Sequence, residues 1–222
     1  MAEIRLGVLG GTFNPIHVGH LVFAESFRER LALDRVLFVP AGAPPHKPAK
    51  GIAPAIDRYA MVSLAVAGHP AFAASATEVA RPGPSYSAET VERLAGEWPG
   101  VRLFFLMGSD TFLELPTWRT PERLGAFATL AVGWRAGTTF DPDGGPAKAV
   151  LARLGGGTWR RLPPAAPEAL APGDVALVET RSLPVSAGEI RQALAGGESV
   201  RYRVPPLVAD YIAAHHLYRG PA

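Results

Sequence analysis

Short, continuous apolar runs alternate along the chain with longer segments in which apolar residues recur every three or four positions. Such a run of four to eight residues is typical of a strand that is buried on both faces, whereas the wider spacing is typical of a helix with one buried face. The apolar runs predict strands over 4–9, 35–40, 72–79, 101–107, 126–134 and 175–180. The helical spacing predicts helices over 18–32, 55–68, 87–98, 147–154, from Ser186 onward and over 205–215, with a further helix after Asp110.

Strands that alternate with helices of about 10–15 residues indicate βαβ units and a mostly parallel sheet. We therefore expect an α/β, Rossmann-like fold, with helices on both faces of the sheet and a C-terminal helical segment. In such sheets a ligand binds beyond the carboxyl ends of the strands. The length of 222 residues suits one domain, and we expect a single domain over 1–222. Residues 136–174, rich in Gly and Pro, show no clear periodicity outside 147–154.

The composition narrows the class of protein. With 48% hydrophobic and 19% charged residues the chain can bury a full core, which excludes wholesale disorder. No apolar run reaches the roughly 18 residues of a membrane span, and no signal peptide precedes the first strand, so we expect a cytoplasmic protein without a membrane partner. The absence of cysteine excludes disulfides, thiolate metal sites and a cysteine nucleophile.

The charge balance gives no indication of a nucleic-acid partner. The formal net charge is only +2, and no block of five or six like charges occurs. The chain has a single Asn, a single Gln and no Cys, a depletion of thermolabile side chains that predicts high thermal stability.

The most informative segment runs from Gly10 to His20 and reads GGTFNPIHVGH. It follows a predicted strand and leads into a predicted helix, which is where α/β proteins bind phosphates. Paired glycines allow a ligand to come close to the backbone, and the start of a helix offers free N–H groups with a partial positive charge. His17 and His20 are three residues apart, so they share one face there and can donate hydrogen bonds to phosphate oxygens.

Two ordinary surface histidines would be the plainer interpretation of this segment. The glycine pair, the single Asn (Asn14) and both histidines fall within the same short stretch, however, and this concentration favours a phosphate site. The segment contains neither a Walker A loop nor a GxGxxG sequence.

The segment resembles the H-x-G-H signature of the nucleotidyltransferase superfamily, and its GGTFNP sequence is similar to the bacterial nicotinate-nucleotide adenylyltransferase branch. The glycerol-3-phosphate cytidylyltransferase branch carries Asp at the position of Asn14. Class I tRNA synthetases share a related histidine motif, but no KMSKS sequence follows here. The resemblance covers nearly the whole chain apart from 136–174.

Two further segments match the family pattern. The sequence PPHK over 44–47 would ordinarily be a solvated turn, but the resemblance implies that Lys47 is a mobile cation that closes over phosphates. After the strand at 101–107, Asp110 would ordinarily cap a helix and Trp118 would ordinarily belong to the core. The resemblance implies instead that Gly108 allows a close approach, that Asp110 binds a ribose hydroxyl, and that Trp118 stacks on the pyridine ring.

Two helix starts complete the pattern. Ser87 would ordinarily cap the helix at 87–98, but the resemblance implies that the backbone at this turn holds the nicotinate carboxylate. The sequence VSAGEIR over 185–191 resembles the second signature of the superfamily, with Gly188 in place of the usual Thr. Ser186 and Glu189 have the spacing of a capping box, which is compatible with phosphate binding. Arg191 can bind a phosphate with two hydrogen bonds from its planar guanidinium. The sequence over 204–218 resembles the terminal helix of the family, and we expect it to serve packing.

The resemblance implies transfer of AMP from ATP to nicotinate mononucleotide in NAD biosynthesis, with the second phosphate-binding motif in a C-terminal segment of about 182–222. It implies ATP and nicotinate mononucleotide as partners and allows for a homo-oligomer. No carboxylate cluster suggests a metal site in the protein, so we expect Mg²⁺ to arrive with ATP. The implied catalytic residues are His17, His20 and Arg191; those for ATP and phosphate are Gly10, Gly11, Thr12, Lys47, Gly108, Asp110, Ser186 and Arg191; those for the mononucleotide are Asn14, Ser87, Trp118 and Arg119.

Several alternatives stay open at this point. The acceptor can be nicotinamide mononucleotide or another phosphorylated compound. A phosphopantetheine adenylyltransferase is disfavoured because that family is shorter and lacks the context of Trp118. A regulatory module that binds a nucleotide without turnover is a different class, and an RNA-binding synthetase fragment is disfavoured by the absence of a basic patch.

Overall fold

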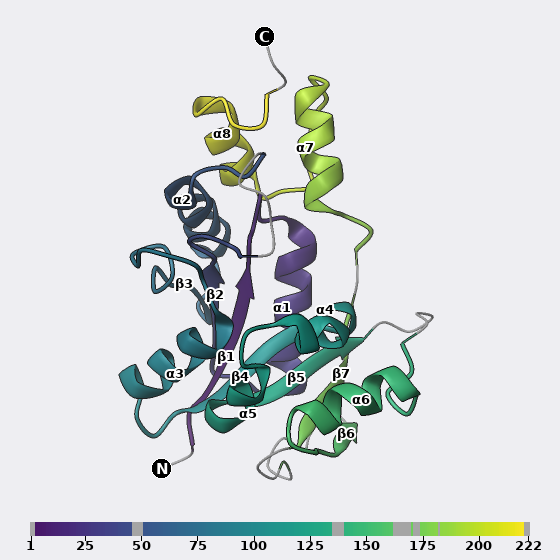
Figure 1. Cartoon of the computed structure of the whole chain (residues 1–222). Coiled ribbons are helices and arrows are strands. Elements are labelled where there is room, and N and C mark those ends of the chain that lie inside the picture. The colour runs from purple at the N-terminus through teal and green to yellow at the C-terminus, as the bar shows by residue number, and fades with distance from the viewer. Residues whose placement is uncertain are drawn as a thin grey trace. The chain divides into compact units, whose positions relative to one another are not determined.

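The computed structural model of the chain describes residues 3–45, 51–134, 140–161, 170, 174–181 and 183–219 (Figure 1). The strands are β1 (Arg5–Gly11), β2 (Arg35–Pro40), β3 (Phe72–Ala74), β4 (Arg102–Gly108), β5 (Thr129–Trp134), β6 (Trp159–Arg161) and β7 (Val175–Glu179). The α-helices are α1 (Val18–Arg30), α2 (Ala55–Val66), α3 (Ser87–Glu97), α4 (Ser109–Glu114), α5 (Leu124–Phe127), α6 (Gly145–Arg153), α7 (Ala187–Ala195) and α8 (Pro206–Ala214). Within the described ranges, none of these helices is long and apolar enough to span a membrane.

The strands form one seven-stranded sheet in the order β3-β2-β1-β4-β5-β7-β6. The sheet is parallel, and its central pairs β1–β4, β4–β5 and β5–β7 align the buried runs Leu6–Val8, Leu103–Met107 and Val175–Val178. The order reverses between β1 and β4, because the chain builds outward from β1 in one direction and then returns to build in the other. This arrangement confirms the predicted α/β, Rossmann-like fold, in which ligands bind where the strand order reverses.

The described chain divides into two compact units. The first contains 1–10, 23–36 and 86–181, and the second contains 11–22, 37–85 and 182–222. The boundaries interleave along the sequence, so neither unit is a continuous segment, and the expectation of a single domain over 1–222 stays a prediction. Residues 11–20 of the histidine segment and the C-terminal motif belong to the same second unit.

Each unit has its own buried apolar residues. In the first unit, α3 buries Val91 and Leu94 and lies against β4 and α5. In the second unit, α2 packs on α8, with Met61 and Val62 buried on one helix and Val208 and Ile212 on the other. The buried pairs named on α3 and α8 are three and four residues apart, which is the spacing from which the helices were predicted.

The predicted strand over 72–79 is wrong beyond residue 74. The hydroxyl of Ser75 lies 2.8 Å from that of Thr77 and accepts a hydrogen bond from the Thr77 backbone N–H. Such local bonds of Ser and Thr compete with a strand ladder, so the chain leaves the sheet in a turn.

The predicted strand over 126–134 begins later than expected, at Thr129, because Leu124–Phe127 forms the short helix α5. A short apolar run does not distinguish a buried strand from a buried helical turn. Strand β6 was not predicted, since its sequence Trp-Arg-Arg has no apolar alternation.

Candidate active site

The glycine turn of the second unit is shaped around the ring of Phe13. A Cβ atom on Gly11 would lie 3.0 Å from that ring, which explains the glycine by packing. Phe13 itself has a φ of 45°, in the left-handed region that is unfavourable for a bulky side chain. Its buried ring meets the edge of the His20 imidazole at a centroid distance of 5.1 Å. Phe13 therefore packs against His20, one of the two predicted catalytic histidines. The sequence did not suggest this role.

His17 and His20 lie together, as the sequence predicted. Their rings stack with centroids 3.7 Å apart and an interplanar angle of 27°. The backbone N–H of His17 donates to Nδ1 of His20 at 3.2 Å, and the backbone N–H of His20 donates to the carbonyl of His17 at 3.0 Å. Because Nδ1 of His20 accepts, the proton of the neutral ring is on Nε2, which makes Nε2 a hydrogen-bond donor.

His17 is the more deeply buried of the pair, with only 7% of its surface exposed. Burial lowers its pKa from 6.5 to about 4, so the ring is neutral near pH 7. Among the described residues its Nδ1 atom has no hydrogen-bond partner, although it is buried. A Cβ on Gly19 would lie 3.0 Å from this same atom, so the glycine of the H-x-G-H motif leaves room for the His17 ring.

The C-terminal motif supplies a capped helix and an arginine to the second unit. Ser186 accepts from the Glu189 N–H, and the Glu189 carboxylate accepts from the Ser186 N–H, so the predicted capping box is confirmed. Arg191 donates from Nη1 to the backbone carbonyl of Asn14 at 2.7 Å. The structure thus brings Arg191 to the histidine loop across 177 residues of sequence. Phosphate binding by Ser186 and Arg191 stays a prediction.

Asn14 is buried, and its side chain is bound within the protein. Its Oδ1 accepts from the Ala53 N–H at 3.0 Å and from the Tyr218 hydroxyl at 2.8 Å, and its Nδ2 donates to the Gly51 carbonyl at 2.9 Å. An amide oxygen has two acceptor positions, and both are filled. The sequence assigned Asn14 to the mononucleotide. That contact stays a prediction. The hydrogen bonds show that the Asn14 side chain fixes the conformation of the loop.

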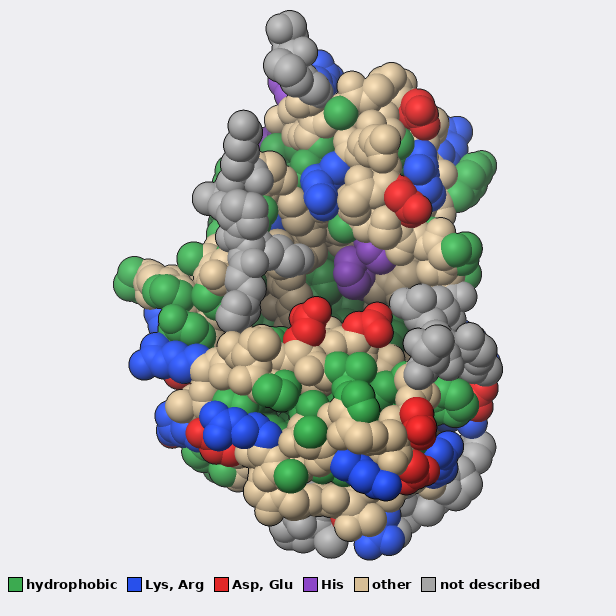
Figure 2. All heavy atoms as spheres, turned by 45° about the vertical axis from the view of Figure 1, so that its right-hand side comes forward, with side chains coloured by type: hydrophobic (Ala, Val, Ile, Leu, Met, Phe, Trp, Pro, Cys, Tyr) green, Lys and Arg blue, Asp and Glu red, His purple; other side chains and the backbone are tan. Residues whose placement is uncertain are grey.

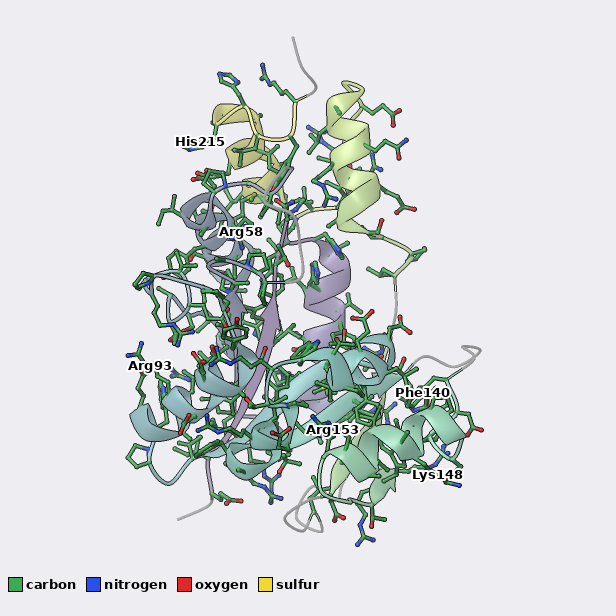
Figure 3. All side chains as sticks on the ribbon, in the orientation of Figure 1. Arg58, Arg93, Phe140, Lys148, Arg153 and His215 are labelled. Carbon is green, nitrogen blue, oxygen red and sulfur yellow. The ribbon has the colours of Figure 1, made fainter. Side chains whose placement is uncertain are left out.

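Arg58 was not predicted as a functional residue, yet it organises the same loop (Figure 3). Its side chain is only 1% exposed and donates to three backbone carbonyls at 2.8–3.0 Å, those of Thr12, Gly42 and Ala53. Burial lowers the pKa of Arg58, and the buried Glu78 acts in the opposite direction.

The sequence contained a signal that could have identified Arg58 as a buried, hydrogen-bonded residue. It lies on the same helical stripe as the buried Met61, Val62 and Val66, where a charged side chain is out of place unless it is bound.

Gly42 is another residue that the sequence did not single out. A Cβ atom there would lie 2.5 Å from the backbone oxygen of Glu78, so only glycine fits. Its N–H donates to the Ser85 hydroxyl at 2.9 Å, and its carbonyl accepts from Arg58. These bonds fix the start of the loop that carries Lys47, which itself lies outside the described residues.

In the first unit, β4 ends at Gly108 and passes directly into α4. Gly108 is the residue before the helix, and a Cβ atom built on it meets nothing within 4 Å. Asp110 is exposed in the first turn and does not cap the helix. At the end of β1, a Cβ on Gly10 would make only ordinary contact with the Phe105 ring at 3.8 Å. Packing therefore does not account for Gly10 or Gly108, and their predicted contact with ATP stays a prediction.

Trp118 and Arg119 follow α4 in the same unit. The half-buried indole of Trp118 meets the Phe105 ring edge-on, with centroids 6.3 Å apart. The guanidinium of Arg119 lies 4.6 Å from the centre of the Tyr86 ring and 3.7 Å from the Glu89 carboxylate. Tyr86 and Glu89 flank the start of α3, so Arg119 lies near this helix start. The contacts of Trp118, Arg119 and Ser87 with the mononucleotide stay predictions.

The residue that precedes α3 differs from the plainer interpretation of the sequence. The residue before the helix is Tyr86, and it makes no capping hydrogen bond from its side chain, so the plainer interpretation of Ser87 as the cap is wrong. N–H groups at a helix start, next to an arginine, suit a carboxylate.

Charge and metal ligands add little to this picture. On the face shown in Figure 2, Lys and Arg side chains alternate with Asp and Glu side chains instead of gathering in one basic patch. In the part of the chain that the structure describes, no group of three or more His, Asp or Glu side chains is placed to hold a metal ion.

Comparison with known proteins shows the family to which this chain belongs. The cytidylyltransferase-like family model matches residues 8–193. The chain belongs to this family. The probable nicotinate-nucleotide adenylyltransferase of Thermomicrobium roseum is 43% identical over 215 residues, which is 97% of this chain and 92% of that protein. The protein of the same name from a Synechococcus strain is 41% identical over 217 residues, with 98% and 96% of the two chains covered. Within the cytidylyltransferase-like family, the chain therefore belongs to the nicotinate-nucleotide adenylyltransferase branch.

Solved structures of the family share the fold. Nicotinic acid mononucleotide adenylyltransferase from Plasmodium falciparum, in complex with NaAD, superposes with a TM-score of 0.71 at 16% identity, covering 97% of this chain and 98% of that one. At this identity the likeness establishes the fold alone.

Proposed function

We propose that this protein transfers AMP from ATP to nicotinate mononucleotide and releases deamido-NAD and pyrophosphate. The observation that carries the proposal is the stacked pair of His17 and His20 on the start of α1, with Arg191 bound to the same loop. The relatives that are named nicotinate-nucleotide adenylyltransferases match this chain over nearly its whole length, which supports the same activity here.

The reaction needs no general base. An ionised phosphate oxygen of the mononucleotide attacks the α-phosphorus of ATP, a new P–O bond forms, and the bond to the β-phosphate oxygen breaks as pyrophosphate leaves with the electron pair. Catalysis then consists of alignment and of neutralising charge on the α-phosphate and the leaving group.

The second unit supplies the groups for the triphosphate. Neutral His20 donates from Nε2, and Arg191 and the start of α7 at Ser186 add a cation and further N–H donors. We assign the glycine turn, including Thr12, and Lys47 to the same triphosphate. Mg²⁺ enters this proposal as part of the MgATP substrate, because such ions are usually held by phosphates and water with few protein ligands.

The first unit supplies the groups for the nucleosides. We assign Trp118 to stacking on the pyridine ring, Asp110 to a ribose hydroxyl, and Gly108 to close approach by ATP. The N–H groups at the start of α3 and the guanidinium of Arg119 form the positive environment for the nicotinate carboxylate. We also propose a cytoplasmic location.

The deciding experiment measures pyrophosphate release from ATP with nicotinate mononucleotide, nicotinamide mononucleotide and phosphopantetheine in parallel. We expect turnover with the nicotinate compound and about 10²-fold lower kcat/KM with the amide. Turnover with phosphopantetheine alone, or binding of ATP without turnover on any acceptor, would contradict the proposal.

A further inference from the structure

We infer that Tyr218, in the turn that follows the last helix, is a positioning residue for the histidine pair and acts through the side chain of Asn14. The inference deepens the proposed function and rests on it, because it gives the C-terminal turn a part in the same reaction. From the sequence this region was expected only to pack.

The first observation is the way in which Asn14 is held. The Tyr218 hydroxyl donates to Oδ1 of Asn14 at 2.8 Å, across 204 residues of sequence. The Ala53 N–H fills the second acceptor position of the same oxygen, and Nδ2 is bound to the Gly51 carbonyl. Three bonds in different directions fix the plane of the amide, and the phenol of Tyr218 is the single side chain among these three partners.

The second observation is the short path from Asn14 to the histidines. Only Pro15 and Ile16 separate Asn14 from His17, and both are buried, Ile16 completely. The Asn14 carbonyl also accepts from Arg191, so a shift of Asn14 moves the predicted phosphate-binding arginine together with the His17 backbone. The His17 N–H in turn sets the ring orientation of His20.

The third observation is the conformation of the turn that carries Tyr218. His216 and Tyr218 both have φ in the left-handed region, at 54° and 61°. Two non-glycine residues in this region are unfavourable, and such conformations persist where surrounding contacts hold them. Burial raises the pKa of Tyr218, so the phenol keeps the proton that it donates.

Tyr211 offers a matched control. It lies on α8, seven residues before Tyr218, and its hydroxyl donates to the Asp57 carboxylate at the same distance of 2.8 Å. Tyr211→Phe and Tyr218→Phe each remove one phenolic oxygen and one hydrogen bond, but only the second of these touches Asn14.

The experiment compares these two variants with the unchanged protein in three measurements. Thermal unfolding monitors the fold, steady-state kinetics with ATP and nicotinate mononucleotide give kcat and KM, and ¹⁵N NMR of the ligand-free protein monitors the imidazoles of His17 and His20. We expect similar small losses in Tm for both variants. In Tyr218→Phe alone, kcat should fall about tenfold with little change in KM, and the imidazole signals should shift.

Two outcomes overturn the inference. One is that Tyr218→Phe leaves both the histidine signals and kcat as Tyr211→Phe does. The other is that Tyr218→Phe lowers kcat further in an Asn14→Ala background, because that background has already lost the acceptor. The NMR arm needs no substrate, so a failure of the proposed function, seen as no turnover by the unchanged protein, is distinguishable from a failure of this inference.

Discussion

The backbone N–H of His17 donates to Nδ1 of His20, and this bond determines which ring nitrogen of His20 carries the proton. The donor is a main-chain group, so this bond depends on the conformation of the loop. With the His17 ring stacked on it, the His20 ring also has little freedom to turn. The geometry therefore fixes the position of the proton on the His20 ring before any ligand binds, which is the preorganisation that electrostatic catalysis requires.

Replacement of His20 tests this arrangement. We expect His20→Ala to lower kcat by about 10²–10³, because a preorganised donor to the transferred phosphate is lost, while Tm stays close to that of the unchanged protein. The exposed His215, which stacks on Tyr211, provides the control variant His215→Ala with unchanged turnover. Near-normal kcat in His20→Ala would mean that His20 makes no contribution to catalysis.

The buried His17 predicts a pH dependence of stability. Its pKa is about 4 in the folded protein and about 6.5 when unfolded. Between these values the unfolded chain binds a proton that the folded chain does not, so the free energy of unfolding falls as the pH drops from 6.5 to 4 and is unaffected by this group above 6.5. The loss approaches about 1.4 kcal/mol per pH unit.

Urea unfolding at pH 7, 6 and 5 measures this loss in the unchanged protein, in His17→Gln and in His215→Gln. The slope that His17 contributes should disappear in His17→Gln and persist in His215→Gln. Identical slopes in all three proteins would show that His17 is hydrated in solution.

Arg119 should determine the preference for the acid over the amide. Trp118 offers the same face to both rings, whereas Arg119 can form an ion pair with the carboxylate but only a hydrogen bond to the neutral carbonyl oxygen of the amide. We expect Arg119→Ala to reduce the ratio of kcat/KM for nicotinate and nicotinamide mononucleotides by about tenfold, mainly through the nicotinate compound.

The matched control for Arg119 is Arg123, which binds Glu92 on the same helix α3 through two hydrogen bonds. Arg123→Ala removes an arginine–glutamate pair of the same kind further along α3 and should leave the ratio unchanged. An unchanged ratio in Arg119→Ala would assign the selectivity to the N–H groups of α3 alone.

Arg58 should be among the side chains most costly to replace. Arg58→Met leaves three main-chain carbonyls without this donor, one of them fully buried, and we expect a loss of about 3–5 kcal/mol in the free energy of unfolding. Arg28→Met removes a partly exposed pair with Glu25 and should cost about 1 kcal/mol or less. Chemical denaturation of both variants gives the comparison, and equal costs would mean that water replaces the guanidinium.

The composition gives one prediction about the whole chain. With one Asn, one Gln and no Cys, the protein should unfold above the usual mesophile range of about 45–65 °C. Differential scanning calorimetry measures this directly, and a midpoint inside that range would leave genomic codon bias as the explanation of the composition.

The sequence predicted the fold where its patterns have a direct physical meaning. The apolar run at 35–40 became β2 without a change in its bounds, and the helix predicted over 87–98 begins at Ser87 as expected. The spacing of Ser186 and Glu189 predicted the capping box. The pattern failed at 75–79, where hydroxyl groups bond locally, and this competition is not visible in hydrophobicity.

The site was predicted in part for the same reason. His17 and His20 belong to a local motif, so their neighbourhood is determined by sequence spacing. Asn14 and Tyr218 meet only through the tertiary fold, and no local pattern joins residues so far apart. Arg58 lies between these cases, since its place on an apolar helix face was visible but its three main-chain acceptors were not.

The binding of Arg58 to Thr12, Gly42 and Ala53 also limits how this loop system can change by evolution or design. All three partners are main-chain carbonyls, so Arg58 constrains the lengths of these loops and not the identity of their side chains. An insertion in any one loop displaces its carbonyl and leaves the guanidinium partly unpaired, whichever loop was altered. Transplanting the histidine loop into another scaffold would therefore require the other two loops and the arginine to be transferred with it.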